Sequence, residues 1–219
     1  MAGFEVTGVD IKPQPNYPYN FVQADILEYL ANNWQKYDAI HLSPPCQKHS
    51  ASTAVHKSKG YEYPDIIPQL REILSNIPLP WVMENVSNAG LRPDIVLYGT
   101  MFSLRVKRKR IFELGNWFCL QPSNQRTNKG VVTGDFVSVF GHTSLKKSKG
   151  KLIEPNFREG TILNTWKIAM GVDTTIKIKD VELSQGIPPA YTKYIGAQLK
   201  DFIKYKQSHN DNNRLQPHA

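Results

Sequence analysis

The sequence has little cysteine and no long apolar run. Cys46 and Cys119 are the only cysteines among 219 residues, so we expect no disulfide framework and a reducing, cytoplasmic setting. No Cys/His cluster has the spacing of a zinc site, so no metal is expected. No apolar run approaches the ~20 residues needed to cross a bilayer, and the first residues lack the apolar segment of a signal peptide. These absences favour a globular protein with one α/β domain or a core plus a small lobe.

Positive charge is concentrated in the middle of the chain. The formal net charge is +8, but residues 1–104 carry −3, residues 105–167 carry +9 and residues 168–219 carry +2. A basic middle third indicates a surface that binds a polyanion. Lysines that only keep a surface solvated would give the same bias, and charge alone does not separate the two interpretations.

Cys46 follows a predicted strand and two prolines. Tyr37–Leu42 is an apolar run typical of a buried strand, and Pro44 and Pro45 stop it abruptly. A cysteine on a stiff loop after a strand is presented to a cleft at a fixed position, as a catalytic nucleophile must be. The alternative is a small buried apolar residue, which describes most free cysteines.

Two further predicted strands end on acids. Phe4–Asp10 and Phe21–Asp25 each combine an apolar run with a terminal aspartate, with a proline-rich loop between them. An acid at the carboxyl end of a strand in a nucleotide-binding sheet commonly accepts hydrogen bonds from ribose hydroxyls. Asp25 is equally well placed to cap a predicted helix over Ile26–Asn33.

A carboxylate and two arginines are candidate partners of Cys46. Glu84 and Asn85 end a short apolar strand from Trp81, which follows a helix predicted over Asp65–Asn76. If the sheet is parallel, they lie at the same edge as Cys46. A strand over Val106–Glu113 would put Arg108 and Arg110 on one face with Phe112, aimed at an internal anion or carbonyl. Glu84 could also be a satisfied structural residue, although glutamate is rarely buried without a partner.

The rest of the chain has weaker patterns. Residues 115–165 mix turn formers, short β-like runs and a flexible basic loop around Lys146–Lys151, typical of a small irregular lobe. From Val181 an apolar stripe at helical spacing predicts a helix. The residues after Gln207 are polar and are expected to be disordered. We therefore divide the chain into a core (1–114), a lobe (115–165), a helical return to the core (166–206) and a tail (207–219).

Taken in order, these motifs resemble the cytosine-C5 DNA methyltransferases, most closely the short phage and bacterial type found in restriction-modification systems. Pro45-Cys46-Gln47 resembles the nucleophile loop of that family, and Glu84-Asn85-Val86, 38 residues later, resembles its ENV motif. Val106–Arg110 resembles the QxRxR motif with Val106 in place of glutamine. Glu182–Tyr191 and, more loosely, Tyr194–Leu199 resemble the closing segments. The resemblance implies a Rossmann-like methyltransferase sheet with a small β-rich target-recognition lobe.

The resemblance also implies roles for individual residues. Cys46 would attack C6 of a cytosine flipped out of double-stranded DNA, Glu84 would contact N3 and the exocyclic amine, and Arg108 and Arg110 would hold the base carbonyl. The methyl donor would be S-adenosyl-L-methionine, bound by Asp10, Ile11, Asp25, Ile26 and Pro45. Contacts to DNA are assigned to Gln47 and Ser50 and to four lysines of the basic loop, Lys146, Lys147, Lys149 and Lys151.

One departure leaves the activity open. The family opens with a strand and a glycine-rich FxGxG loop, which binds the methionine end of the cofactor, and a helix follows this loop. In this chain the residues from Met1 already resemble the end of that helix. Either an upstream start supplies this motif, or the chain is a truncated, catalytically impaired methyltransferase-like protein that binds DNA. An RNA cytosine methyltransferase of the same lineage is a third interpretation.

Overall fold

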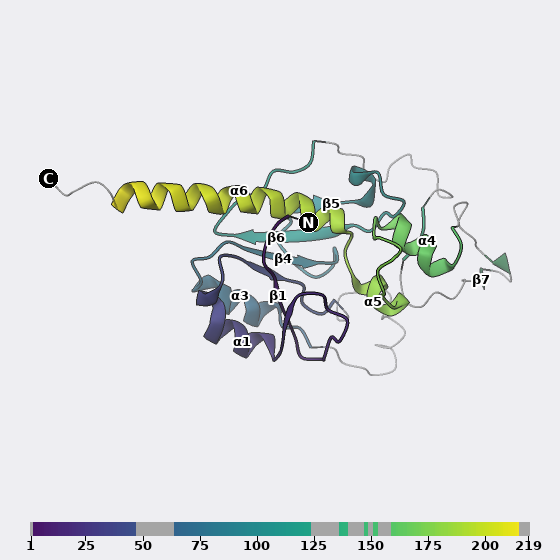
Figure 1. Ribbon diagram of the computed structural model, residues 1–219, viewed down its shortest axis with the longest axis horizontal. Coiled ribbons are helices and arrows are strands. Elements are labelled where there is room, and N and C mark those ends of the chain that lie inside the picture. Colours follow the sequence, from purple (N-terminus) through teal and green to yellow (C-terminus); the bar gives the residue numbers. More distant parts are fainter. Residues whose placement is uncertain are drawn as a thin grey trace.

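The computed structural model describes residues 2–46, 64–123, 136–139, 147–148, 151–152 and 159–214. Within them the chain forms five α-helices, eight β-strands and two short 3₁₀ helices (Figure 1). The strands are β1 Thr7–Asp10, β2 Asn20–Gln23, β3 Ile40–Leu42, β4 Trp81–Asn85, β5 Ile95–Leu97, β6 Arg110–Gly115, β7 Lys147–Ser148 and β8 Lys151–Leu152. The helices are α1 Ile26–Asn33, α3 Ile67–Ser75, α4 Ile162–Ala169, α5 Asp180–Gln185 and α6 Pro189–Arg214, with η1 Trp34–Lys36 and η3 Gly99–Phe102.

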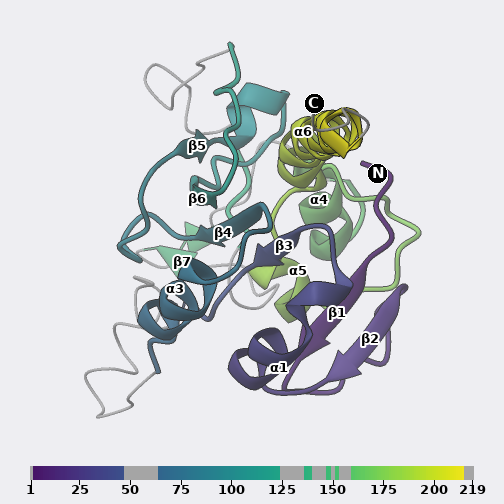
Figure 2. The same ribbon diagram turned by 90° about the vertical axis from the view of Figure 1, so that its left-hand side faces the viewer.

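The strands form two groups in the centre of the molecule. β1 and β2 make a parallel pair, and a second sheet has the order β3-β4-β6-β5. β3 and β4 are parallel, whereas β6 runs antiparallel to both β4 and β5. Figure 2 shows the β1–β2 pair beyond β3, on the side away from β4. The fold is therefore mixed α/β.

Helices cover both faces of this central layer (Figure 1). On one face, α1 and α3 bury Leu30, Leu70 and Leu74 against Ile40, Leu42 and Met83 of β3 and β4. On the other face, α6 buries Tyr191, Ile195 and Leu199 against Val82, Phe112 and Leu114 of β4 and β6. Both faces of the β4 strand are apolar because both are covered, as expected for a strand in the middle of an α/β sheet.

A smaller cluster joins the α4–α5 region to the core. Trp166 and Met170 at α4 and Leu183 of α5 pack with Val106 and with Val137 and Val139 of the short segment 136–139. This cluster fixes the residues that lead into β6. It brings α4, which the sequence pattern did not predict, beside the arginine-containing segment.

Most predicted elements of the core are confirmed. The first strand ends at Asp10, the helix Ile26–Asn33 has the predicted bounds, and the helix predicted over Asp65–Asn76 is α3, Ile67–Ser75. Asp25 is the N-cap of α1, with Oδ1 accepting from the N–H groups of Leu27 and Glu28. The carboxyl ends of β3 and β4 lie at one edge because these two strands are parallel.

The strand predicted over Val106–Glu113 is wrong in its first half. β6 begins at Arg110, and Arg108 has a left-handed backbone with φ of 30°. Val106 and Lys107 instead pass against Gly99, whose N–H donates to the Lys107 carbonyl. A Cβ on Gly99 would clash with the Val106 carbonyl oxygen, so only glycine permits this approach. Val106 and Phe112 therefore belong to different clusters.

Two predictions about the second half are also corrected. The basic loop contains an antiparallel strand pair, β7 with β8. The tail does not begin at Gln207, because α6 continues to Arg214. No helix in the described ranges is both long and apolar enough to cross a membrane.

Candidate functional site

The loop that carries Cys46 is fastened to the end of the neighbouring strand. Asn85, the last residue of β4, donates from Nδ2 to the Pro44 carbonyl at 3.0 Å, and its Oδ1 accepts from the Val86 N–H. Ser43 hydrogen-bonds to Glu84, the residue before Asn85. Pro44 is buried and Cys46 is half-buried. The loop is therefore held at Ser43 and Pro44, the two residues that follow β3, and Pro45 alone separates this anchored part from Cys46.

Glu84 and Arg110 form a buried ion pair next to the loop. Arg110 Nε lies 2.8 Å from Glu84 Oε1, and their side chains are 14% and 8% exposed. The antiparallel β4–β6 register makes this possible, because it pairs Asn85 with Ile111 and so puts the first residue of β6 beside the end of β4. Burial raises the pKa of Glu84, while Arg110 and Arg108 and the Ser43 hydrogen bond act in the opposite direction.

Arg108 occupies the same region but its donors reach main-chain carbonyls. Its Nε donates to Gly186 at 2.9 Å, Nη1 to Val139 at 2.8 Å and Nη2 to Ser184 at 2.6 Å. Its own carbonyl accepts from the Tyr191 hydroxyl at 3.0 Å. Burial, followed by repulsion from Arg110, lowers the pKa of Arg108 to about 10. Arg108 thus ties the α5–α6 connection to segment 136–139, and Arg110 is the arginine paired with Glu84.

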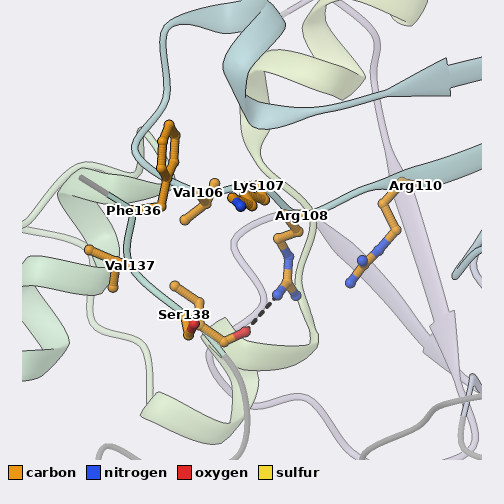
Figure 3. Close-up of a pocket in the computed structure, with 8 residues that line it drawn as sticks. Val106, Lys107, Arg108, Arg110, Phe136, Val137 and Ser138 are labelled. Carbon is orange, nitrogen blue, oxygen red and sulfur yellow. Dashed lines mark hydrogen bonds between the residues drawn. The ribbon is translucent and has the colours of Figure 1, made fainter. Parts of the chain in front are cut away.

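A pocket adjoins the two arginines (Figure 3). Its volume is about 360 Å³, and it is lined by Val106, Lys107, Arg108, Arg110 and the four residues 136–139. Figure 3 shows Phe136 and Arg110 at opposite sides of the lining, with Arg108 between them. The Lys107 ammonium lies 5.9 Å from the Phe136 ring centre. Three cations and one aromatic ring suit a planar, polar or anionic ligand.

The two cysteines have different surroundings. Arg108 interacts electrostatically with Cys46, so a positive charge stands near this thiol. Cys119 lies among apolar residues of the α6 cluster, and its burial raises its pKa to about 11. Both are free thiols. The surroundings of the two thiols therefore differ, because a cation stands near Cys46 whereas apolar side chains surround Cys119.

The residues assigned to the cofactor all follow the carboxyl ends of strands. Asp10 ends β1 and accepts from the Lys12 N–H and from Gln14 Nε2, while Ile11 is 65% exposed. Asp25 and Ile26 follow β2 and begin α1, and Pro45 is exposed in the Cys46 loop. Acids with accessible neighbours at this edge fit the ribose and adenine of a nucleoside. The described residues contain no group of three or more acids, histidines or cysteines that could hold a metal.

The residues assigned to DNA lie mostly outside the described ranges. Gln47, Ser50, Lys146 and Lys149 are not among the described residues, and Lys147 and Lys151 are described only as parts of β7 and β8. The assignment of these six residues stays a prediction.

Two residues of the site, Ser43 and Tyr191, were not singled out from sequence, whereas Asn85 was expected at the same edge as Cys46. Ser43 and Asn85 hold the Cys46 loop, and Tyr191 holds the backbone of Arg108. Asn85 carried a local signal, since a buried amide at a strand end needs partners. Ser43 and Tyr191 carried none, because their contacts join segments far apart in the chain.

A comparison of the chain with protein-family models and with curated proteins finds no match to either.

Proposed function

We propose that this chain is a DNA (cytosine-5-)-methyltransferase that transfers a methyl group from S-adenosyl-L-methionine to C5 of a flipped cytosine through a covalent Cys46 adduct. The observation that carries the proposal is the convergence of three distant segments. The Cys46 loop, Glu84 with Asn85, and Arg110 meet where β3, β4 and β6 lie side by side. Attack on C6 of cytosine requires a thiolate, a proton donor and a cation together.

Each residue has a chemical part in this reaction. The Cys46 sulfur forms a bond to C6, and the electron pair of the C5–C6 double bond moves into the ring. Glu84 meets this change by giving a proton to N3, and the raised pKa of this carboxyl group favours the protonated form that can do so. Arg110, held by Glu84, offers donors to the base carbonyl. After C5 is methylated, a base removes the C5 proton, the C5–C6 double bond re-forms and the C6–S bond breaks, so that Cys46 leaves as the thiolate and N3 returns its proton to Glu84.

The cofactor would supply the methyl group, and the chain supplies residues that fit its nucleoside half. Asp10 is placed to accept from ribose hydroxyls, Ile11 and Ile26 to contact the adenine, and Asp25 and Pro45 to border it. These positions agree with a Rossmann-like methyltransferase sheet, in which ligands bind beyond the carboxyl ends of parallel strands.

Covalent trapping tests the proposal. A pool of random-sequence duplexes containing 5-fluorocytosine is incubated with the chain and S-adenosyl-L-methionine, since fluorine at C5 cannot leave as a proton and the adduct persists. We expect a DNA–protein adduct that maps to Cys46, is lost in Cys46→Ser and is kept in Cys119→Ser. Cys46→Ser should still bind the duplex.

Other outcomes separate the alternatives. Duplex binding without measurable S-adenosyl-L-methionine binding would identify the chain as a methyltransferase-like DNA-binding protein. Methyl transfer to a tRNA pool in preference to duplex DNA would identify an RNA enzyme. An adduct retained in Cys46→Ser would refute the assignment of the nucleophile.

A further inference from the structure

The pocket beside the arginines has a wall whose residues alternate between buried and accessible. In segment 136–139, Val137 and Val139 are buried in the cluster around Trp166, whereas Phe136 is half-buried and Ser138 is exposed. All four residues line the pocket. The valines therefore anchor this wall to the fold, and the aromatic ring and the hydroxyl group are its accessible part.

The two arginines of the lining are fixed by bonds to the protein. The Arg108 guanidinium donates to three main-chain carbonyls, among them that of Val139 in the pocket wall at 2.8 Å. Arg110 is paired through Nε with Glu84. Both arginines add positive charge to the pocket, but their bonds hold them in place within its lining.

Lys107 is the cation of the lining that is left for a ligand. It is half-buried, and its ammonium lies 5.9 Å from the centre of the Phe136 ring. Within the described ranges this ammonium has no hydrogen-bond acceptor and no ion-pair partner. An ammonium carries three N–H donors, and partial burial without acceptors is unfavourable. A ligand in the pocket is therefore expected to present acceptors to Lys107.

The lining suits a nucleobase, and among the bases it suits guanine. The Phe136 ring and the buried valines offer apolar contacts to a planar group, and a volume of about 360 Å³ is small among ligand pockets. The major-groove edge of guanine carries two acceptors, O6 and N7, and no donor. Adenine and cytosine carry an amino group there, and thymine has one acceptor beside a methyl group. A positively charged lining with a free ammonium favours the edge that only accepts.

We propose that this pocket holds a guanine next to the target cytosine, and that Lys107 recognises it by donating to O6 and N7. Arg110 places the pocket beside the target, because it belongs both to the lining and to the ion pair with Glu84. The inference rests on the proposed function, in which Glu84 contacts the target base. Lys107 is then a residue that determines the DNA sequence the chain selects.

Sequencing of trapped DNA tests the proposal. Duplexes with one fixed 5-fluorocytosine and random neighbours are incubated with the chain and S-adenosyl-L-methionine, and the DNA in the covalent adduct is sequenced. We expect guanine to be enriched at least about tenfold at one position next to the target pair, the discrimination typical of one good contact to both acceptors. The same pool, recovered by equilibrium binding to the chain, measures the preference without the covalent step.

A matched pair of lysines locates the recognition. Lys109 also lies over a ring, 5.7 Å from the centre of Tyr98, but it is exposed and does not line the pocket. Lys107→Met should abolish the preference for guanine, and Lys107→Arg should keep it, because arginine also donates to O6 and N7. Lys109→Met removes the same charge and should leave the preference unchanged. Circular dichroism and thermal unfolding check that the three variants fold.

The other outcomes would overturn the inference. Enrichment of another base, or of none, next to the target would show that the pocket does not hold guanine. If Lys107→Met weakens binding to all sequences alike and lowers the salt slope by about 0.9, Lys107 contacts a phosphate instead. If no sequence forms an adduct, the proposed function fails, and the duplexes recovered by binding then decide whether Lys107 recognises guanine.

Discussion

At the scale of single residues, Glu84 is a carboxylate whose burial is explained by its partners. It is 6% exposed and is held by Arg110 and Ser43. Glu113 offers a close comparison, since it lies on β6, is 4% exposed and pairs with Arg71 at 2.6 Å. The two carboxylates differ in what surrounds them, because only Glu84 adjoins the Cys46 loop.

We expect Glu84→Gln to lower the rate of covalent attack by orders of magnitude, because an amide cannot give N3 a proton. Glu113→Gln should reduce stability but leave the attack rate per folded molecule nearly unchanged. Single-turnover adduct formation with the fluorinated duplexes measures both. Equal reductions of the rate in the two variants would assign Glu84 a purely structural part.

The raised pKa of Glu84 also predicts how stability changes with pH. A carboxyl group whose pKa is higher in the folded state keeps its proton longer there, so its contribution to stability is present at low pH. As the pH rises above the ordinary value of 4.5 and through the folded pKa, that contribution is lost. Urea unfolding of the wild type and of Glu84→Gln from pH 4 upward should show this decline only in the wild type. A decline of equal size in both would place its origin in another group.

At the scale of elements, the end of β4 positions the Cys46 loop. Asn85 is 2% exposed, and its amide is the donor to the Pro44 carbonyl. Asn116 makes similar bonds elsewhere, donating to the carbonyls of Ile77 and Leu79 at 2.7 and 2.9 Å. Variants of Asn85 and Asn116 would each lose hydrogen bonds to main-chain carbonyls, but only a variant of Asn85 would also release the Cys46 loop.

Asn85→Asp replaces the donor with an acceptor and leaves a buried carbonyl without its partner, which costs about 1–3 kcal/mol of stability. We expect this variant to form the adduct at least tenfold more slowly while binding duplex as before. Asn116→Asp should lose comparable stability and keep the rate. If Asn85→Asp keeps the wild-type rate of adduct formation and of Cys46 alkylation, the amide does not position the loop.

Elements that are fixed by local interactions were predicted more accurately than elements that depend on contacts with other segments of the chain. α1 was predicted to the residue because its cap, Asp25, and its apolar positions are local. The strand expected over Val106–Glu113 failed because its first half is held out of the sheet by Gly99, which bonds to Lys107, and by Tyr191, 83 residues after Arg108. α4 was missed although it carries a local signal, since Ile162, Trp166, Ala169 and Met170 recur at helical spacing and pack into one cluster. The second half of α6 is polar, but it continues a helix already anchored by Tyr191, Ile195 and Leu199.

The same reasoning applies to the site. The position of the Cys46 loop beside Glu84 could be predicted, because both lie at the carboxyl ends of strands that were expected to be parallel. The hydrogen bonds from the Arg108 guanidinium to the carbonyls of Val139, Ser184 and Gly186 could not be predicted, because main-chain acceptors carry no sequence signal.

At the scale of the whole molecule, positive charge is distributed unevenly along the chain. Residues 105–167 carry +9, and they include Lys107, Arg108 and Arg110 at the pocket as well as the lysines around β7 and β8. If this excess binds the DNA backbone, it does so by releasing counterions, and affinity must then fall with salt in proportion to the number of phosphates neutralised.

Replacing Lys146, Lys147, Lys149 and Lys151 with glutamine therefore tests whether the basic middle third of the chain forms a surface that binds DNA. Each lysine that neutralises a phosphate adds about 0.9 to the slope of log affinity against log salt, so removing all four should lower the slope by up to about 3.6. The control replaces Lys177, Lys193, Lys204 and Lys206, four exposed lysines of the last part of the chain, and changes the net charge equally. If both quadruple variants shift the slope alike, only net charge matters. An unchanged slope in the first would show that its lysines merely solvate the surface, and the DNA would then have to be held by the arginines and Lys107 at the pocket.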